Sequence, residues 1–409
     1  MKRVVVTGMG AISSLGQDWT SFRANLEAGV SGIRYMSDWD RFDKLNTRLG
    51  GPVEFDIPGH YNRKRIRAMG RVSLLATRAS EIALEDAGLL ADPLLKSGKI
   101  GVAYGSSTGS PDATSEMARM MIDADMSAIT ATTYLRMMGH TAPVNIGVFF
   151  GLKGRVYTTS SACTSGSQGI GYAYETIKRG QQIAMVAGGA EELCFTEAAV
   201  FDTLYATSTR NDQPSTNPRP FDRDRDGLVI GEGAGTLILE EREHALARGA
   251  TIHAEVVGYG TNSDGGHVTQ PTPATMQVAM ELALQDADLS PEAISYVQAH
   301  GTATDRGDVA ESHATNALFG ERMPISSLKG HLGHTLGACG ALESWASIEM
   351  MNEGWFAPTL NLEHVDERCA ELDYIRGEGR VIDSQYVMNN NFAFGGINTS
   401  LIFKRHAGS

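Results

Sequence analysis

Short apolar runs rich in β-branched residues alternate with segments of helical period along the chain. The runs 4–7 and 100–104 are each followed by a glycine, a pattern typical of buried strands. Between them, Leu75, Ala79 and Ala83 fall on one face of a helix that is expected to end at Gly88. This alternation of strands and helices predicts an α/β fold.

The second half of the chain repeats this order of elements. A strand-like run at 252–257 opens it, and residues 281–289 echo residues 81–89 in their apolar and acidic positions. Two explanations stay open: an internal duplication with a boundary near residue 250, and a chance similarity between helices of common composition.

Under a duplication the chain divides into an N-terminal half, residues 1–250, and a C-terminal half, residues 251–409. No linker rich in proline, serine or glycine separates the halves, so we expect them to share one packed core. Residues 208–226 hold three prolines among polar residues and are predicted to form a long loop.

The composition excludes several classes of protein. Of the 409 residues, 42% are hydrophobic and 20% are charged, an ordinary globular balance. Lys and Arg total 35 against 48 Asp and Glu, a net charge of -13, so no nucleic acid or anionic membrane is an expected partner. The apolar run after Arg3 is too short for a secretion signal, and no apolar stretch of about twenty residues predicts membrane insertion.

The four cysteines indicate a reducing environment. None belongs to a CxxC pair or combines with the eleven histidines in a zinc-type spacing; they are Cys163, Cys194, Cys339 and Cys369. We therefore expect no disulfide framework, no bound structural metal and a cytoplasmic location.

Cys163 is the first candidate for chemistry. It lies in the segment 160–166, which follows a β-rich run and precedes a helix-like stretch from Gly169 to Arg179. At such a strand-to-helix turn, exposed N–H groups and the helix dipole favour the thiolate, the form that attacks carbonyl carbon. A nucleophile and a small cysteine buried in a packed turn are both consistent with this motif.

Two further polar clusters flanked by glycine lie in the second half. His300 follows a predicted strand, and Lys329 and His334 stand five positions apart in the glycine-rich segment 327–338. Taken singly, each histidine could be a structural hydrogen-bonded group. Three such clusters together indicate a site, because α/β folds assemble their sites from loops at strand ends.

These motifs resemble those of the β-ketoacyl-acyl carrier protein synthases, the condensing enzymes of the thiolase fold. The similarity covers essentially the whole chain, and the nucleophile Cys163, the HGTxT segment at His300 and the KxxxGH segment from Lys329 to His334 occur in the family's order. The resemblance implies a thiolase-like fold with five αβαβα layers, built from two duplicated halves. Residues 188–194 look closer to synthase I than to synthase II.

The resemblance also implies a two-stage acyltransferase of fatty acid biosynthesis. Cys163 would take an acyl chain from an acyl carrier protein as a thioester. Malonyl carrier protein would then lose carbon dioxide and attack that thioester, which gives a β-ketoacyl chain two carbons longer. His300 and His334 would stabilise the enolate oxygen, because neutral imidazoles donate hydrogen bonds to developing negative charge. The substrates are carried on phosphopantetheine, and no cofactor is implied.

Four residues would support this chemistry. The backbone N–H groups of Cys163 and Phe394 would form the oxyanion hole, and Lys329 would fix the hydrogen bonding of the histidines. Glu343 would brace this lysine or a bound monovalent cation; a plain surface position on a helix is the alternative for Glu343.

Thr302 and Thr304 correspond to the family's contacts with the pantetheine arm. Their hydroxyls can form hydrogen bonds with the amides of that arm. The sequence departs from the family pattern just after them, where Asp305 stands in place of the usual proline, so we expect a less rigid loop with added charge. Ile397 likewise replaces a usual threonine. Neither change removes a catalytic group, and both leave the substrate preference open.

The acyl pocket is expected to involve Thr108, Met138 and Phe392. Thr108 falls where family members vary a residue that limits chain length, and Met138 falls where the dimer partner approaches. Ordinary core packing is the alternative for Thr108 and Met138. Pocket volume discriminates by only about 1–3 kcal/mol per methylene, so chain length and unsaturation stay open.

A basic cluster forms a local positive patch on this acidic protein. Its members fall within nine positions: Arg63, Lys64, Arg65, Arg67 and Arg71. A solvated face is the common explanation for such a run. The docking surface of the family includes this segment, however, so we expect Arg63, Lys64 and Arg67 to steer the acidic carrier protein.

Together these features predict a cytoplasmic, homodimeric condensing enzyme. Two alternatives stay open: the same condensation in a secondary polyene or polyketide pathway, and a non-catalytic partner subunit of the chain-length-factor type. Such a subunit lacks the nucleophile, whereas this chain has Cys163. A nucleotide site is not expected, because the glycines near the start are out of register with a dinucleotide-binding loop.

Overall fold

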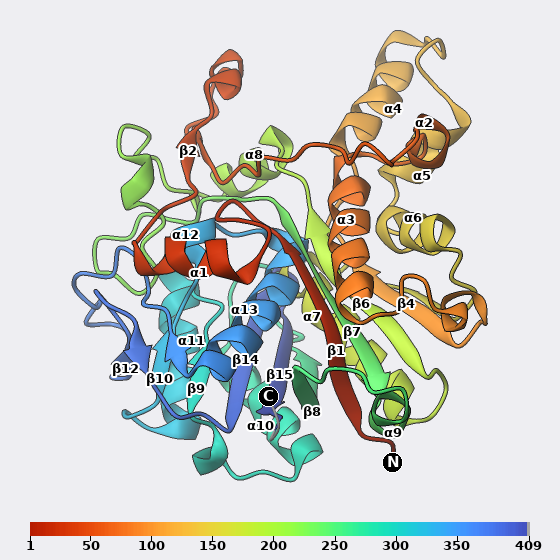
Figure 1. Ribbon diagram of the computed structural model, residues 1–409. Coiled ribbons are helices and arrows are strands. Elements are labelled where there is room, and N and C mark those ends of the chain that lie inside the picture. Colours follow the sequence, from red (N-terminus) through yellow and green to blue (C-terminus); the bar gives the residue numbers. More distant parts are fainter. Residues whose placement is uncertain (407–409) are drawn as a thin grey trace.

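A computed structural model describes residues 1–406, which form one mixed sheet of eleven strands and two sheets of two strands (Figure 1). The order of the large sheet is β12-β10-β9-β14-β15-β8-β1-β7-β6-β4-β5. One half of it contains β1 (Val4–Ile12), β4 (Ile100–Gly105), β5 (Val156–Thr158), β6 (Ala184–Glu191) and β7 (Gly233–Glu241). The other half contains β8 (Ala254–Ser263), β9 (Tyr296–Gln298), β10 (Pro324–Ser326), β12 (Asp373–Tyr374), β14 (Tyr386–Ala393) and β15 (Ile397–Arg405). The small sheets pair β2 (Arg34–Tyr35) with β3 (Leu49–Gly50), and β11 (Trp355–Phe356) with β13 (Arg380–Val381).

Helices lie on the outer faces of both half-sheets and between them. The long helices are α3 (Arg71–Asp86), α4 (Pro111–Asp123), α6 (Thr141–Phe150), α7 (Ser165–Lys178), α10 (Pro273–Ala287), α11 (Asp305–Phe319) and α13 (Cys339–Glu353). The shorter ones are α1 (Trp19–Glu27), α2 (Arg63–Ile66), α5 (Ala131–Met137), α8 (Phe195–Asp202), α9 (Arg242–Ala247) and α12 (Lys329–Leu332). Single turns are η1 (Ser37–Arg41), η2 (Pro93–Lys96), η3 (Ala162–Thr164), η4 (Pro214–Thr216), η5 (Pro291–Ala293) and η6 (Leu336–Ala338).

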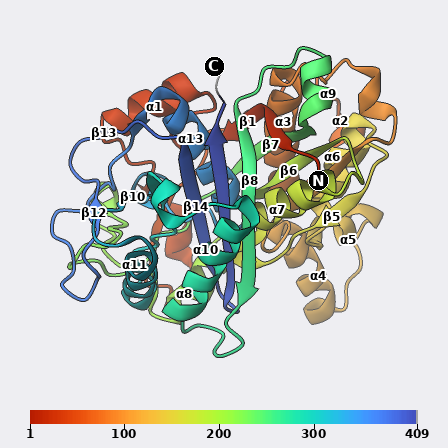
Figure 2. The ribbon, with the colours of Figure 1, turned by 90° about the horizontal axis from the view of Figure 1, so that it is seen from below.

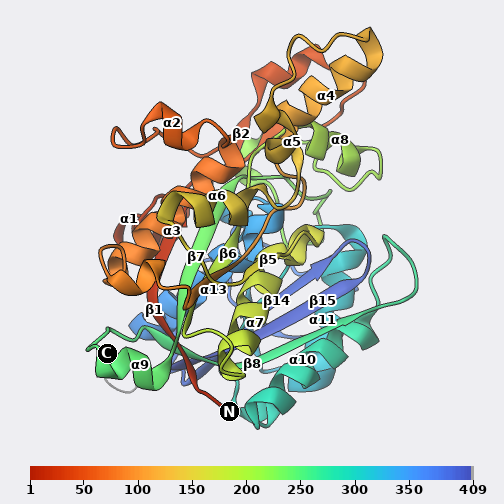
Figure 3. The same cartoon turned by 90° about the vertical axis from the view of Figure 1, so that its right-hand side faces the viewer.

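The two half-sheets are joined at one end only, where 4–6 of β1 pair with 254–256 of β8. The central helices α7 and α13 contact strands of both halves (Figure 3). On the outer faces, α3 and α6 cover β1, β7 and β4, while α10 lies across β8 and β15 and packs on α11 (Figure 2). The layers therefore run αβαβα, which confirms the predicted α/β fold with five layers.

The same packing occurs in both halves, where a glycine of the first strand meets the helix that covers it. A Cβ at Gly8 of β1 would stand 2.2 Å from the carbonyl oxygen of Ala83 in α3. A Cβ at Gly258 of β8 would stand 2.3 Å from the carbonyl oxygen of Ala283 in α10. Only glycine allows the backbones to approach this closely, so the repeated residues hold the repeated contact.

An aspartate at the end of each of these helices completes the repeat. Asp86, the last residue of α3, accepts a hydrogen bond from the N–H of Met9 at 2.9 Å. Asp286, near the end of α10, accepts one from the N–H of Tyr259 at 3.2 Å. The similarity between residues 81–89 and 281–289 thus corresponds to equivalent positions in the two halves.

Several sequence predictions can be compared with these elements. The helix predicted before Gly88 is α3, and Gly88 lies just beyond it with a φ of 67°. The predicted loop at 208–226 contains only the turn η4 and one bridging residue, Asp222. The division near residue 250 falls between α9 and β8 and remains a prediction. Within residues 1–406, no helix combines the length and the apolar character needed to cross a membrane.

Candidate active site

Cys163 lies in the single turn η3, between strand β5 and the start of α7. The preceding Ala162 has a φ of 51°, which directs the chain sharply into the helix. Cys163 is buried, and its Sγ lies 2.9 Å from Nε2 of His334. The turn predicted from sequence therefore places the thiol beside a histidine from the other half of the chain.

His334 is held on both sides by the backbone of a neighbouring segment. Its N–H donates to the carbonyl of Val229 at 2.6 Å, and its carbonyl accepts from the N–H of Gly231 at 2.8 Å. The N–H of Leu336 donates to Nδ1 of the ring at 3.3 Å. Since Nδ1 accepts, the proton of the neutral ring is on Nε2, which points at Cys163.

His300 is arranged in the same way. The Nζ of Lys329 donates to its Nδ1 at 3.3 Å, so the neutral ring carries its proton on Nε2. The rings of His300 and His334 have centroids 5.1 Å apart and are nearly perpendicular, at 86°. Both imidazoles thus offer an N–H to the region beside Cys163.

Burial keeps both histidines neutral. It lowers the pKa of His300 and of His334 well below the ordinary histidine value, and the charge of Lys329 lowers each further. At neutral pH the two rings are hydrogen-bond donors with no net charge, as the sequence analysis expects.

Lys329 and Glu343 form a buried ion pair behind His300. The Nζ of Lys329 donates to Oε1 of Glu343 at 2.5 Å, and the amide of Asn391 donates to Oε2 at 2.7 Å. Burial opposes the charge on Lys329, but the carboxylate of Glu343 raises the pKa of the lysine overall. Glu343 is therefore not a surface residue.

The monovalent cation considered beside Glu343 does not fit these contacts. Each carboxylate oxygen already accepts a hydrogen bond from a nitrogen, and the ammonium of Lys329 takes the place next to Glu343 that a cation would take. The grouping of His300, Cys339 and Glu343 is close enough for a metal, but Lys329 bridges His300 and Glu343.

The structure differs from the expectation that the turn favours a thiolate. Burial raises the pKa of Cys163 to about 12, although the charge of Lys329 and the backbone N–H groups of Phe394 and Cys163 act in the opposite direction. The thiol is therefore the resting form. The N–H groups of Phe394 and Cys163 lie beside the sulfur, and their role as an oxyanion hole remains a prediction.

Phe394 reaches this position because the turn between β14 and β15 contains two glycines. Gly395 and Gly396 have φ values of 87° and 71°, which a residue with a side chain adopts only with strain. The ring of Phe394 packs against that of Phe201, with centroids 5.1 Å apart. The turn thus brings a backbone N–H to Cys163 and an aromatic ring to α8.

A cavity of about 480 Å³ opens onto Cys163. Its lining includes the cysteine, both histidines, the two threonines of the predicted pantetheine contacts and one predicted pocket residue. These are Cys163, His300, His334, Thr302, Thr304 and Phe392. This volume is within the usual range for the site of a small organic ligand. The cavity therefore connects the reactive thiol with the two threonine hydroxyls.

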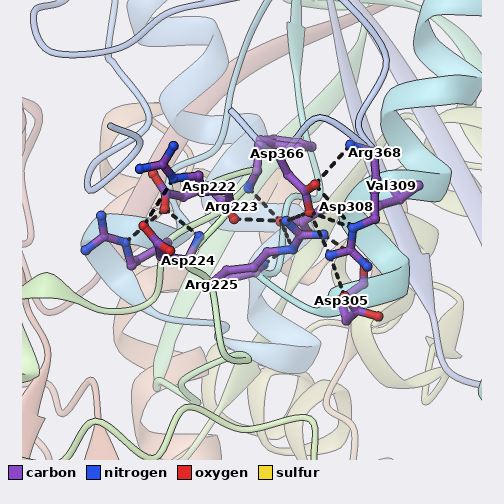
Figure 4. A network of polar contacts seen from close by, with 12 residues as sticks. Asp222, Arg223, Asp224, Arg225, Asp305, Asp308, Val309, Asp366 and Arg368 are labelled. Atoms are coloured by element: carbon purple, nitrogen blue, oxygen red, sulfur yellow. Dashed lines mark hydrogen bonds and ion pairs between the residues drawn. The ribbon is translucent and has the colours of Figure 1, made fainter. Parts of the chain in front are cut away.

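A buried polar network holds the threonine loop in place (Figure 4). Nε of Arg225 donates to the carbonyl of Thr304 at 3.2 Å, and its NH1 pairs with Asp366 at 2.6 Å. Asp308 accepts from the N–H of Ala303 at 3.1 Å. The hydroxyls of Thr302 and Thr304 lie 2.9 Å apart. The side chains of Arg225 and Asp308 thus both hold the loop.

The expectation of a less rigid loop after Thr304 is wrong. Asp305 begins helix α11, its carbonyl accepts from Arg225 at 2.9 Å, and its carboxylate pairs with Arg368 at 2.7 Å (Figure 4). An acidic residue is favoured in the first turn of a helix, which compensates for the missing proline.

Sequence reasoning missed Glu311, a buried residue of α11. Its two oxygens accept hydrogen bonds from the N–H groups of His300 and Gly301, each at 2.7 Å. Burial raises the pKa of Glu311 to about 8. The only signal in the sequence is an acidic residue one helix after the HGT segment, and such residues are common on helix surfaces.

The two other residues predicted for the acyl pocket lie outside the cavity lining. The hydroxyl of Thr108 donates to Oε1 of the buried Glu197 at 3.0 Å. Met138 follows α5, and its carbonyl would stand 3.0 Å from a Cβ at Gly109. The structure thus places Met138 beside the Thr108 segment, and the pocket roles of both residues remain a prediction.

The members of the basic cluster differ in their contacts. Arg63, Lys64 and Arg67 are exposed on and just after α2. Arg65 instead stacks on Phe149, and Arg71 pairs with Glu232 at 2.7 Å. The three residues predicted to dock a carrier protein are therefore available to solvent in the described chain.

Comparisons with known proteins agree with this geometry. The sequence model of the β-ketoacyl synthase N-terminal domain matches residues 1–245, and that of the C-terminal domain matches residues 253–363. The chain is 38% identical over 414 residues to 3-oxoacyl-[acyl-carrier-protein] synthase 2 of Synechocystis, covering 99% of this chain and 98% of the relative. It is 37% identical over 408 residues to synthase 1 of Escherichia coli, covering 99% of both. These near-equal values leave the leaning towards synthase I a prediction.

Two solved structures are similar over the whole chain. A β-ketoacyl synthase from Burkholderia phymatum is 62% identical with a TM-score of 0.98, covering 99% of this chain and 100% of that chain. The ishigamide ketosynthase/chain length factor is 32% identical with a TM-score of 0.90, with the same coverage. Matched in sequence from end to end and in fold to known ketosynthases, the chain belongs to the β-ketoacyl synthase family.

Proposed function

We propose that this protein catalyses the decarboxylative condensation of an acyl chain on Cys163 with a malonyl group on an acyl carrier protein, in fatty acid elongation. The observation that carries the proposal is the arrangement of Cys163, His300 and His334 at the end of one cavity, with both imidazoles neutral. The relatives named 3-oxoacyl-[acyl-carrier-protein] synthase support the same reaction.

In the first stage the thiol of Cys163 attacks the thioester of an acyl carrier protein. A bond forms between Sγ and the acyl carbon, the bond from that carbon to the carrier sulfur breaks, and the cysteine proton leaves with the carrier thiol. The backbone N–H groups of Cys163 and Phe394 face this point and stabilise the oxyanion. Because the resting thiol has a raised pKa, these donors act on the transition state and not on a preformed thiolate.

In the second stage the pantetheine arm of malonyl carrier protein brings the malonyl group into the cavity. Its carboxylate leaves as carbon dioxide, and the electron pair moves onto the thioester oxygen as an enolate. Nε2–H groups of His300 and His334 donate to that oxygen, and the ring separation of 5.1 Å allows one oxygen to accept from both. The enolate carbon then attacks the acyl carbon, and Sγ leaves and takes up a proton.

Lys329 and Glu343 would act through the histidines. Lys329 fixes the tautomer of His300 by donating to Nδ1, and its positive charge keeps both rings from taking up a proton. Thr302 and Thr304 would bind the amides of the pantetheine arm from their place on the cavity wall. No cofactor is needed for either stage.

We further propose that the active form is a homodimer. Strand β5 is an edge of the large sheet, and Val156 on it is 51% exposed. Exposed apolar side chains continue over the neighbouring α4 to α6 region, at Met121, Ile122, Met126, Tyr134 and Val148. An apolar edge of this kind is typical of a surface that pairs with another chain.

The carrier protein would dock at Arg63, Lys64 and Arg67, whose charges are exposed and complementary to an acidic partner. A cytoplasmic location, expected from the four cysteines, stays a prediction; all four are unpaired in the structure.

A secondary polyene or polyketide pathway is the second candidate. The similarity to the ishigamide ketosynthase/chain length factor keeps it open. The non-catalytic subunit is not favoured, because the nucleophile and both histidines are present and in contact.

The test is turnover with defined substrates. Purified protein is incubated with saturated and polyunsaturated acyl carrier proteins and with malonyl carrier protein, and the carrier-bound product is weighed. Saturated chains that gain two carbons as a β-ketoacyl group support fatty acid elongation. Turnover of polyenoyl chains alone would move the enzyme to the second pathway, and no product with any chain would overturn the proposal.

A further inference from the structure

Glu197 on α8 is a buried carboxyl with an unused oxygen. The residue is 5% exposed, and the hydroxyl of Thr108 donates to Oε1 at 3.0 Å. Oε2 has no hydrogen-bond partner among the described residues. A buried polar atom left without a partner destabilises the fold, so an oxygen in this state points to a ligand or a water that is not part of the chain.

The two acidic residues that precede it in the sequence are fully used. Glu191 accepts hydrogen bonds from Ser106 and from the N–H groups of Ser107 and Gly337, at 2.8–3.0 Å. Glu192 accepts one from the N–H of Val72 at 2.8 Å and one from Ser110 at 3.3 Å. Each of these serves to hold the fold together. Glu197 differs from them in having only one oxygen engaged.

The environment of this acid favours its protonated form. Burial raises the pKa of Glu197 well above its ordinary value, and repulsion from Glu191 raises it further. A protonated carboxyl group has an O–H that can donate a hydrogen bond. Oε2 can therefore both donate to and accept from an oxygen of a ligand.

Glu197 lies on the face of α8 that leads to the reactive cysteine. Phe201 stands four residues further along the helix, on the same face, and its ring lines the cavity together with Cys163. Ala198 and Phe201 belong to one apolar cluster with Cys163. Glu197 itself does not line the cavity.

The partner of Glu197 is also close to the cysteine loop. The carbonyl of Ser107, next to Thr108, accepts a hydrogen bond from Ser160 at 3.2 Å. Ser160 lies three residues before Cys163. Thr108 and Glu197 thus form a polar pair near the loop that carries the nucleophile.

Two chains have to meet at the sulfur during condensation. The pantetheine arm that carries the malonyl group arrives through the cavity, along Thr302 and Thr304. The acyl chain on Cys163 would then extend the other way, past the apolar residues of α8 that cluster with Cys163. A chain with a methyl end would leave the acid at that position unpaired.

We propose that Glu197, oriented by Thr108, binds an oxygen at the distal end of the acyl chain on Cys163, so that the enzyme selects chains that end in a hydroxyl or carbonyl group. This inference rests on the proposed function, because it names the substrate class of the same site. Thr108 is a positioning residue that fixes the carboxyl, and Glu197 is the residue that contacts the chain.

The test compares two ladders of pantetheine thioesters of increasing length, one ending in a methyl group and one in a hydroxyl. The rate of mass addition at Cys163 is measured for each. At the length that reaches Glu197, the hydroxyl chain is expected to react at least about tenfold faster. E197L is expected to reverse this ratio, and E197Q to retain it in part. T108V, which frees the carboxyl to turn, is expected to reduce the ratio.

Equal rates for the two ladders at every length would overturn the inference. Equal rates are the result expected if an internal water, and not an oxygen of the acyl chain, satisfies Oε2. An unchanged ratio in E197L would overturn it as well. The comparison of the two ladders on the wild-type protein tests the inference even if a variant fails to fold. Failure of the proposed function is distinguishable, because Cys163 would then take up no chain from either ladder.

Discussion

At the scale of single residues, the chemistry depends on which atoms carry protons. Nδ1 of His334 accepts from the N–H of Leu336 and Nδ1 of His300 accepts from Lys329, so both Nε2 atoms are donors. His334 in this tautomer is a donor to Cys163 and not its base. Lys329 thus acts on the reaction through the charge and the hydrogen bond it gives to the histidines.

A paired substitution tests the role of this charge. The neutral histidines are needed for activity, and their lowered pKa values place the acidic loss of activity below the ordinary histidine value of 6.5. In K329M/E343Q the positive charge is gone while no buried carboxylate is left unpaired, so the histidine pKa values rise. We expect the acidic limb of malonyl decarboxylation to move to higher pH. K99M, which removes the charge of an exposed lysine, is the control and should leave the limb in place. A limb that also stays in place in K329M/E343Q would contradict the role of Lys329.

Glu311 offers a second test at this scale. In E311Q only one of the two carboxylate oxygens remains, so the N–H of His300 or Gly301 loses its acceptor. The free energy of unfolding should fall by about 1–3 kcal/mol, and turnover should slow because the His300 loop loosens. Chemical denaturation measures the first effect. E321Q, at an exposed position, serves as the control, and its unfolding free energy should change by no more than about 0.5 kcal/mol. An equally small change in E311Q would show that the hydrogen bonds of Glu311 do not stabilise the fold.

At the scale of elements, each half depends on a strand that packs directly on a helix backbone. Periodicity was sufficient to predict α3 and the α/β class, whereas the echo between residues 81–89 and 281–289 left the duplication a prediction. The glycines of β1 and β8 explain why the two halves have similar sequences here, since the same close contact requires the same small residues in both halves.

Replacing one of these glycines tests the contact. A Cβ at Gly258 would stand 2.3 Å from the carbonyl oxygen of Ala283, so G258A forces β8 and α10 apart. We expect a loss of at least about 1–3 kcal/mol in unfolding free energy, measured by denaturation. G147A in α6 is the matched control, because a Cβ there meets nothing within 4 Å. Equal stability of the two variants would refute the close-packing argument.

Other parts of the site could not be predicted from the sequence. Cys163, His300, Lys329 and His334 stand in recognisable motifs, but Arg225 and Glu311 act by hydrogen bonds to the backbone of distant loops, which leave no pattern in the sequence. The thiol pKa was misjudged because burial at Cys163 outweighs the nearby N–H groups. Asp305 appeared to loosen a loop, whereas Arg225 and Arg368 hold it in a helix.

At the scale of the whole molecule, an acidic enzyme has to recognise an acidic carrier. The net charge of -13 gives a general repulsion, and the exposed Arg63, Lys64 and Arg67 provide a local attraction. Association should therefore be fast at low salt and depend on this small region.

Charge reversal tests this surface. K64E/R67E should weaken binding of the carrier protein by at least about tenfold at low salt and remove most of the salt dependence. Titration calorimetry at several ionic strengths measures both. K99E/R322E makes the same change in net charge at two other exposed positions and should have a much smaller effect. Equal weakening by the two double variants would mean that only the overall charge matters.

The central claim is that Cys163 carries the chain that malonyl carrier protein then extends. The most direct measurement is a chase experiment, in which protein acylated with a labelled chain is isolated and mixed with malonyl carrier protein. We predict that the label leaves Cys163 and appears in a carrier-bound β-ketoacyl product, and that C163A takes up no label while keeping its fold. Label that stays on Cys163, or product formed by C163A, would contradict the account.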